Sequence, residues 1–320
     1  MPDADVAAFL ATVPLLEGRE GPDLAELARV MRRRTVAEGD VLWHQGEEAR
    51  EVLFVVEGAL TATLQVPGER TVEIGRAGPG QIVGEIGLLD GRGHTMRVQA
   101  AEPTTLLALG RLDFEAMLRG RNPAAFALKR RLAALFTTRL RTQLRLLAGT
   151  LGGDAAAAEA PALADLEQCR PPDSRYMRRM TTFHDFDPLA LWGFLTSGTY
   201  VRCPPGRTLV AEGTPSPAYF LTVNGAVERV LVRGDRRIRV GLAGPGKAFG
   251  YEGLIDGLPS PLAAVARERS VLLVLPREHF DELFHKEDAV ARVFLEAIQR
   301  DLLASLRHTL RPAARLAASV

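Results

Sequence analysis

The sequence predicts a mainly β protein with flanking α-helices, arranged as two tandem, eight-stranded, jelly-roll-like barrels that are each followed by a long helix. Three observations predict this fold. Short apolar runs punctuated by glycine fill residues 36–109, a spacing typical of a sandwich or barrel. A helical period then begins at Pro123. The second half of the chain repeats both features, with its glycines at a nearly constant offset from those of the first half.

The first half opens with apolar residues that we expect to cap the first barrel. Leu24, Leu27, Ala28 and Met31 recur at helical spacing and end in the basic run 32–34, which predicts a helix. The strands expected to follow are Val41 to Trp43, Val52 to Val56, Leu60 to Leu64, Val72 to Ile74, and the runs around Val98 and around Leu106 and Leu107.

The helix after Pro123 has two distinct faces. Leucines recur along one of them, mostly at spacings of three or four residues: Leu128, Leu132, Leu135, Leu140, Leu144 and Leu147. This apolar face suits packing against its own barrel, and it also suits the pairing of two subunits in a homodimer. The other face is interpreted as a solvated surface, because it carries Arg130, Arg131, Arg139, Arg141 and Arg145.

Matching glycines relate the two halves of the chain. Offsets of 167 residues separate Gly39 from Gly206, Gly46 from Gly213 and Gly58 from Gly225, and an offset of 166 separates Gly80 from Gly246. One residue is therefore deleted in the intervening hairpin. Residues 149–169 are rich in alanine, glycine and proline, which predicts a linker between domains 1–148 and 170–320. A second long helix is expected over about 288–311.

Composition limits the classes of function. The 320 residues carry a net charge of +1, so no overall field attracts nucleic acid or an anionic membrane. No apolar run reaches the roughly 18 residues of a membrane-spanning helix, and Cys169 and Cys203 fit neither a close disulfide pair nor a zinc site. We therefore expect a cytoplasmic protein.

Catalysis and metal binding are not expected. The sequence has no nucleophile–base–acid set and no paired-carboxylate motif, so we expect no enzymatic activity and no required cofactor. His184, Asp185 and Asp187 are metal-ligating residue types placed close together, but a solvated turn is the simpler interpretation. We expect no metal site.

Residues 83–100 are the stretch around which the chain is organised. Val83 and Gly84 precede an acid, Glu85, and a short apolar turn that breaks at Gly91 and Gly93 before an extended run. A glycine-opened turn directs several backbone N–H groups at one point, which favours an anion. A carboxylate beside that anion is tolerated where it faces a neutral hydroxyl. The stretch therefore predicts a site for a phosphorylated ribose, although Glu85 can instead cap its own turn.

This pattern resembles the phosphate-binding cassette of the cyclic-nucleotide-binding fold. That fold occurs in catabolite activator proteins, regulatory subunits of cyclic-AMP-dependent protein kinase and nucleotide-gated channels. The framework residues 39–46 and 54–58 match it as well. The resemblance implies that Glu85 binds the ribose 2′-hydroxyl. The family's phosphate-binding arginine is replaced here by His94, and Thr95 follows where a small residue is usual.

The resemblance implies a ligand site in the first domain for a cyclic nucleotide, cAMP or cGMP. Its candidate residues are Val83, Gly84, Glu85, Ile86, Gly87, Leu88, His94, Thr95, Arg97 and Thr142, the last at about the position where relatives contact the purine. His94 is either the phosphate ligand or a loop histidine with no role. Arg92 or Arg97 can compensate for the missing arginine, but Arg97 alternates with Met96 and Val98, which also fits a solvent-facing side chain.

The second copy of the cassette has lost the residues of a binding site. Tyr251 follows Gly250 in place of the glutamate, Glu252 comes one position late, and Ser260 replaces the phosphate-binding residue. Local basic residues are absent between Lys247 and Arg267. We expect this degenerate pocket to bind no cyclic nucleotide and to be filled by its own side chains.

Two hypotheses follow. The first is a signalling sensor whose first domain binds a cyclic nucleotide and moves its long helix to signal a protein partner. The second is an interaction scaffold with two vestigial pockets. The transcription regulators of this family carry a helix-turn-helix after the long helix. The first long helix here leads to a second barrel and the second ends at Val320, so no DNA partner is expected.

Overall fold

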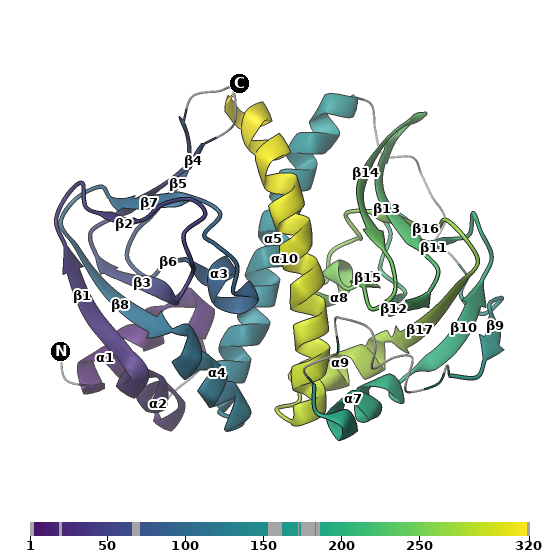
Figure 1. Ribbon diagram of the computed structural model, residues 1–320, viewed down its shortest axis with the longest axis horizontal. Helices are drawn as coiled ribbons and strands as arrows, with labels where there is room; N and C mark the ends of the chain where they lie inside the picture. The colour runs from purple at the N-terminus through teal and green to yellow at the C-terminus, as the bar shows by residue number, and fades with distance from the viewer. Residues whose placement is uncertain are drawn as a thin grey trace. The chain divides into compact units, whose positions relative to one another are not determined.

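The computed structural model describes residues 3–18, 21–65, 71–152, 162–171, 173, 183 and 186–318. The chain forms two compact units. The first consists of Met1–Leu132 together with Ala314–Val320, and the second of Ala133–Ala313. Each unit contains its own β-sandwich, as Figure 1 shows. The expected fold, tandem mainly β domains with a long helix after each, is confirmed.

The first sandwich has two antiparallel sheets, with strand orders β1-β8-β3-β6 and β2-β7-β4-β5. Its strands are β1 (Met31–Val36), β2 (Val41–Trp43), β3 (Glu51–Glu57), β4 (Leu60–Gln65), β5 (Thr71–Ala77), β6 (Ile82–Val83), β7 (Arg97–Ala100) and β8 (Thr104–Gly110). Apolar side chains from both sheets form one core, in which Leu53 and Leu106 of one sheet meet Leu60 and Val98 of the other. The eight expected strands therefore form two facing sheets rather than a closed barrel.

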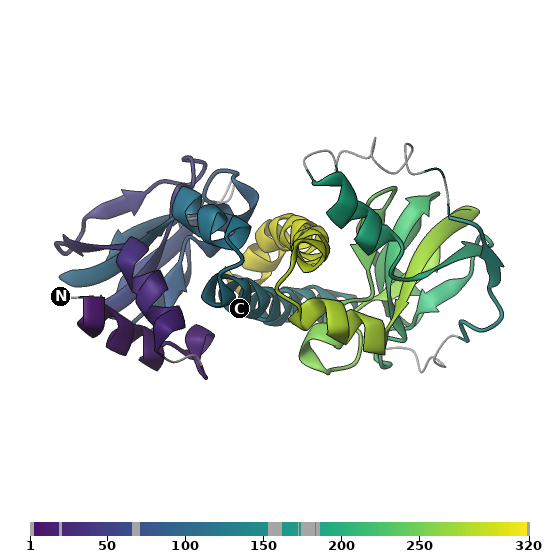
Figure 2. The same cartoon turned by 90° about the horizontal axis from the view of Figure 1, so that it is seen from below.

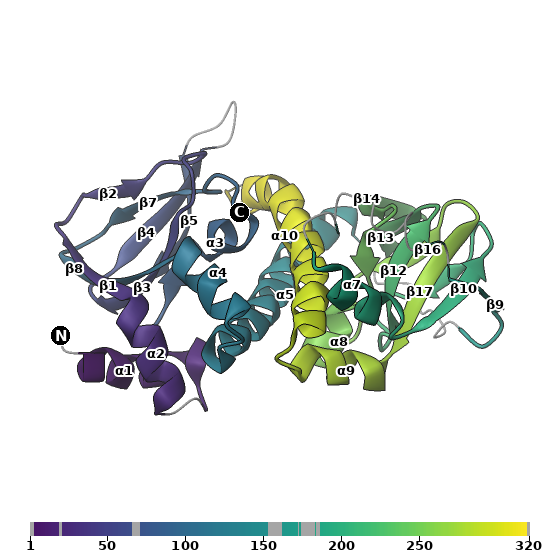
Figure 3. The same ribbon diagram turned by 60° about the horizontal axis from the view of Figure 1, so that its bottom comes forward.

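Helices cover one end of this sandwich. They are α1 (Asp3–Thr12), the 3₁₀ helix η1 (Pro14–Leu16), α2 (Pro22–Val30) and α4 (Arg111–Arg119), and α5 (Pro123–Leu151) follows them in the chain. In Figure 3, α1 and α2 lie together at the end of the sandwich where β1 begins. Leu24, Leu27 and Ala28 are buried, as their helical spacing predicts.

The expectation that the helical period extends into the basic run was wrong. Helix α2 ends at Val30, and Arg32 to Arg34 lie in β1, where Met31 to Val36 pair with β8. Helical spacing could not reveal this boundary, because the partner strand lies more than sixty residues away. The arginines are exposed on a strand at the edge of its sheet, where charge discourages edge-to-edge association.

The second sandwich repeats the first with one addition. Its sheets have the orders β15-β12-β17-β10-β9 and β11-β16-β13-β14. Its strands are β9 (Glu167–Cys169), β10 (Thr199–Cys203), β11 (Thr208–Val210), β12 (Ala218–Asn224), β13 (Val227–Arg233), β14 (Arg236–Ala243), β15 (Ala248–Phe249), β16 (Ala263–Ala266) and β17 (Ser270–Pro276). Strand β9 is the ninth, at the edge of its sheet beside β10, and it comes from the end of the expected linker.

The strand registers make the two copies comparable residue by residue. Strand β4 pairs with β5 and β7, and a bulge follows Ala62. Strand β13 pairs with β14 and β16 in the same registers, and the bulge follows Arg229. A bulge is a specific feature of a strand, so Ala62 and Arg229 occupy equivalent positions.

The second unit contains α7 (Pro188–Leu195), α8 (Glu252–Asp256), α9 (Arg277–His285) and α10 (Ala289–Ala318). Helices α7 and α9 lie at one end of the sandwich (Figures 1 and 3). Helix α10 continues beyond the expected end at Arg311, through Pro312. The parts of α5 and α10 that belong to this unit run side by side (Figure 2), and the Thr309 hydroxyl donates to the Gln143 side chain at 2.6 Å.

The interpretation of the arginine face of α5 as solvated was wrong for several of its members. Arg130 and Arg141 are buried, and Arg131 donates to the carbonyl oxygens of Pro14 and Glu17. Arg145 is exposed, as expected. Among the described helices, none combines the length and the apolar character needed to cross a membrane.

Candidate functional site

The first cassette is built around a glycine-bounded turn. Gly84 precedes α3 (Glu85–Asp90) with φ of 87°, and Gly91 follows it with φ of 63°, both in the left-handed region that favours glycine. A Cβ atom at Gly84 would lie 2.9 Å from the carbonyl oxygen of Glu51. Glycine is therefore required at the start of the cassette for backbone conformation and for space.

Close packing continues inside the turn. A Cβ atom at Gly87 would lie only 2.0 Å from that of Ala49, so the turn sits directly on the chain before β3. The amide of Leu88 donates to the carbonyl of Gly84 at 3.1 Å, and the Leu88 side chain is buried. Val83 and Ile86 are half-buried. The cassette is held as one rigid piece of backbone.

Glu85 is the acidic residue of this cassette, and it is buried with 3% of its surface exposed. A carboxylate that only capped the turn from the solvent side would remain exposed. A buried carboxylate needs polar partners or a ligand, because burial of an uncompensated charge is costly. The ribose-binding role that the resemblance implies for Glu85 stays a prediction.

His94 is held in place by its ring and by its backbone. The imidazole stacks on the indole of Trp43, with ring centroids 4.0 Å apart and an angle of 7° between the planes. The His94 amide donates to the carbonyl of Glu47 at 2.7 Å, and its carbonyl accepts from the amide of Gly46 at 2.8 Å. The side chain is buried. His94 therefore packs within the domain, and its role as a phosphate ligand stays a prediction.

The remaining candidates of the first site differ in their surroundings. Thr95 is half-buried, and Arg97 lies on β7 on the face opposite the buried Val98 and Ala100. Thr142 is exposed on α5, and its hydroxyl donates to the carbonyl of Thr138. Thr142 belongs to the second compact unit, while the other candidates belong to the first. The assignment of these residues to a ligand stays a prediction.

The second cassette has the same backbone as the first. Gly250 has φ of 79°, and a Cβ atom there would lie 2.8 Å from the carbonyl oxygen of Ala218. Ser260 takes the place of His94: its amide donates to the carbonyl of Thr214 and its carbonyl accepts from the amide of Gly213. The Ser260 hydroxyl donates to the carbonyl of Leu262 at 2.8 Å. The backbone was therefore retained in the second copy while the side chains changed.

Side chains of the protein occupy the interior beside this second cassette. Arg229 forms an ion pair with Glu252, and its other terminal nitrogen donates to the hydroxyl of Ser305 at 2.8 Å. Arg229 is 5% exposed, Glu252 2% and Ser305 8%. Burial lowers the pKa of Arg229, but Glu252, Tyr251 and Asp301 together outweigh this effect and raise the pKa above its ordinary value. The guanidinium is therefore charged and neutralised locally.

Two further groups complete this interior. The guanidinium of Arg229 lies 5.9 Å from the centroid of the Tyr251 ring. Tyr251 is fully buried, and among the described residues its hydroxyl has no hydrogen-bond partner, so burial raises its pKa well above the ordinary value. On α10, Asp301 accepts from the amide of Ala248 and pairs with Lys247 at 3.2 Å.

Arg141 of α5 binds the outer loop of the second cassette. Its guanidinium makes two bonds to the carboxylate of Asp256, at 2.5 and 2.8 Å, and donates to the carbonyl of Pro259 at 2.8 Å. Sequence analysis missed this contact and that of Arg229, since neither partner is near in sequence. A charged residue inside the apolar strand 227–232 was the one local signal for Arg229.

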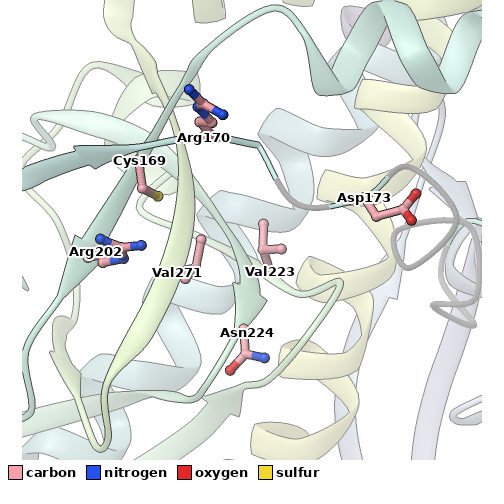
Figure 4. A pocket seen from close by; sticks show the side chains of 7 residues that line it. All are labelled: Cys169, Arg170, Asp173, Arg202, Val223, Asn224 and Val271. Atoms are coloured by element: carbon pink, nitrogen blue, oxygen red, sulfur yellow. The ribbon is translucent and has the colours of Figure 1, made fainter.

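A separate open cleft of about 340 Å³ lies on the second unit. Its lining includes Cys169 of β9, Arg170 directly after β9 and Arg202 of β10 (Figure 4). The rest of its lining is Asp173, Val223, Asn224 and Val271. Arg202 is paired with Glu167 at 2.5 Å, and none of the expected site residues contributes to the cleft.

The structure describes no metal centre. Over the described residues, no three His, Cys, Asp or Glu side chains gather as metal ligands. Asp187 caps α7, accepting from the amides of Leu189 and Ala190 at 3.1 and 2.9 Å. His184 and Asp185 lie outside the described residues.

Comparison with known proteins identifies a shared domain family. The model of the cyclic nucleotide-binding domain matches residues 33–121 and 200–287, which together are more than half of the chain. A cyclic nucleotide-gated potassium channel of Mesorhizobium japonicum is 35% identical over 107 residues, 33% of this chain and 28% of the channel. The cyclic AMP receptor protein of Thermus thermophilus is 33% identical over 129 residues, 40% of this chain and 57% of that protein.

Solved structures include similar proteins of two kinds. The regulatory domain of Toxoplasma gondii protein kinase A with cAMP is 17% identical, with a TM-score of 0.34, over 88% of this chain and 91% of that chain. The N-terminal domain of a transcriptional regulator from Streptomyces coelicolor is 32% identical, with a TM-score of 0.36, over 39% of this chain and 89% of that chain. The family assignment rests on the sequence match, because these TM-scores are low.

Proposed function

The chain belongs to the cyclic nucleotide-binding domain family, and on that premise we propose that its first domain, residues 1–148, is a sensor for cAMP or cGMP. The second domain, residues 170–320, binds neither nucleotide. The protein acts in signalling without catalysis, in the cytoplasm, and α5 carries the ligand-dependent change to a protein partner. A ligand shifts the position of α5 only where its affinity differs between two conformations.

One observation supports this division of roles: the equivalent positions Ala62 and Arg229. Ala62 is a small, half-buried side chain that packs against the core of the first sandwich. Arg229 places a guanidinium at the same point of the second sandwich. The first copy also retains Glu85, buried in its cassette, where the second has Tyr251. The smaller side chain at this position and the buried cassette carboxylate therefore belong to the same domain, which supports placing the nucleotide there.

His94 is proposed as the phosphate ligand of the first domain. Its stack on Trp43 fixes the plane of the imidazole. Replacement of an arginine by histidine removes a bidentate, always charged contact worth roughly 1.5–3 kcal/mol, so affinity about ten- to a hundredfold below that of an arginine-bearing site is expected. A bound phosphate favours the charged form of a histidine that contacts it. Binding through His94 should therefore weaken as the pH rises from about 6 to about 8.

Thermal unfolding of the full chain with cAMP, cGMP and cyclic di-GMP tests the proposal. A ligand at a hundred times its dissociation constant adds roughly 2.7 kcal/mol of stability. We expect cAMP or cGMP to stabilise the wild type and Glu85→Gln to lose the effect. Glu73→Gln is the matched control, because Glu73 is exposed on β5. Calorimetry at about pH 6 and pH 8 then tests His94, and equal affinities would remove it as the ligand.

The second candidate function is the interaction scaffold with two vestigial pockets. The closed interior around Arg229 favours it, since one domain already holds its shape by internal contacts. No stabilisation by any of the three nucleotides would support the scaffold over the sensor. A homodimer through α5 stays a prediction for either function. Leu128, Leu132, Leu140 and Leu144 are buried within the single chain, and sedimentation analysis would reveal whether a second chain also binds the helix.

A further inference from the structure

We propose that Arg229 is a built-in substitute for a ligand in the second domain. Its guanidinium joins the strand β13 to the cassette helix α8 through Glu252 and to α10 through Ser305. These contacts join α10 to the sandwich through side chains of the protein itself. The second domain is thus a permanently closed module, and nucleotide binding to the first domain is not required for this closure.

The duplication provides the reason to regard the guanidinium as an occupant. The bulge and the registers of β4 and β13 align Ala62 with Arg229. The same registers place Val98 of β7 and Ala264 of β16 at matching partner positions. The backbone frame is therefore the same in the two copies. At this one position the first copy has the small side chain of Ala62, and the second has the long, charged side chain of Arg229.

Arg229 contacts two other elements through its guanidinium, as a bound cationic ligand would. Its two terminal nitrogens have different partners on different elements, Glu252 and Ser305. Helix α10 has a second anchor one turn earlier, where Asp301 accepts from the amide of Ala248. These contacts lie on one face of α10, because the residues that make them are spaced four apart: Asp301, Ser305 and Thr309. The helix is fastened at several points along this face.

The charges in this interior discourage a cyclic nucleotide. Taking an isolated ion pair out of water costs more than the pair regains unless the remaining donors are bonded, and Arg229 meets that condition through Ser305. A phosphate entering the pocket would have to displace Glu252 from the guanidinium. It would also approach the carboxylate of Asp301, which lies one helical turn from Ser305. The charges and the volume of the Arg229 side chain therefore both oppose binding of a cyclic nucleotide in this interior.

Hydrogen exchange of the full chain tests this role. Arg229→Ala gives the second domain the residue that the first domain has at this position. We expect the protection of the α10 amides around 301–309 to fall about a hundredfold or more. The reason is that removing one partner of a buried ion pair is strongly destabilising. Arg233→Ala is the matched control. It removes an arginine of the same strand whose partner is Glu212, outside α8 and α10, so α10 protection should change less than about threefold.

Chemical rescue distinguishes an occupant from a general structural role. Methylguanidinium at millimolar concentration should restore α10 protection in Arg229→Ala, and should do nothing for the wild type or for Arg233→Ala. Where Arg229→Ala does not fold, Arg229→Lys replaces it. A single ammonium cannot bond Glu252 and Ser305 in the same forked geometry, so we expect an intermediate loss of protection.

Two results would overturn the proposal. One is unchanged α10 protection in Arg229→Ala or Arg229→Lys. The other is protection of the amides of α8 and β16 in the wild type on addition of cAMP or cGMP, since those elements belong to the second domain. Absence of nucleotide binding to the wild type would defeat the proposed sensor and leave the closure by Arg229 in place, so the two failures are distinguishable.

Discussion

The contact of Arg141 with the second cassette offers a quantitative test of how α5 is held. The guanidinium binds Asp256 through two nitrogens and the carbonyl of Pro259 through a third. The side chains of Arg141 and Asp256 are only 10% and 13% exposed. Replacement of Arg141 by alanine therefore leaves a largely buried carboxylate and carbonyl without this partner, and it removes the packing of the arginine stem.

The expected loss follows from these contacts. Hydrogen bonds to charged groups contribute roughly 1.5–3 kcal/mol each, and breaking a buried pair costs about 3–5 kcal/mol. The remaining exposure of the pair argues for the lower end, so we expect Arg141→Ala to lower the free energy of unfolding by about 3 kcal/mol. For a unit of this size that corresponds to a fall in melting temperature of roughly 6–12 °C.

A double-mutant cycle with Asp256→Ala isolates the pair. We expect a coupling energy of about 1.5–2 kcal/mol from urea unfolding, little reduced by added salt because the pair is largely buried. Arg145→Ala is the control. It lies one turn further along α5 with its side chain exposed, so it should change stability by less than about 0.5 kcal/mol. A coupling energy near zero would contradict the structural role assigned to Arg141.

Three further predictions concern other sites. Ala62→Arg with Ile86→Glu transplants the second domain's ion pair into the first, and it should abolish stabilisation by cAMP or cGMP in thermal unfolding. Burial raises the pKa of Asp301 above its ordinary 3.8. Relative to the unfolded chain, folding therefore favours protonation of the Asp301 carboxyl group. The stability that this group contributes is complete at low pH and is lost as the pH rises through the raised pKa. In urea unfolding from about pH 4 to pH 7, the free energy of unfolding of Asp301→Asn should rise relative to that of the wild type as the pH rises. Burial raises the pKa of Cys203 to about 11, so Ellman's reagent should modify the half-buried Cys169 first and Cys203 only on unfolding.

Features that depend on near neighbours in sequence were predicted well. Gly39, Gly46, Gly58 and Gly80 and their counterparts in the second half all have positive φ, which favours glycine. Their offset therefore predicted the duplication before any contact was known. The strand runs and the start of the helix at Pro123 follow from apolar periodicity, which reports one face of one element.

Features that depend on distant partners were missed. Strand β1 exists because Met31 to Val36 find β8, and β9 exists because residues 167–169 find β10. Arg141 was expected to be solvated, because nothing near it in sequence is acidic, yet its partner Asp256 is 115 residues away. Arg229 meets Ser305 from 76 residues away.

The sequence by itself determined that this is a duplicated, mainly β chain of the cyclic nucleotide-binding kind, and that only the leading cassette has a carboxylate, Glu85, directly after its first glycine. The tertiary structure decided what fills each interior: the His94 ring is stacked on Trp43 in the first copy, and Arg229 is paired with Glu252 in the second. The physical reason is that backbone turns are imposed by steric limits within a few residues. The cost of burying a charge is set by whichever groups the fold brings beside it.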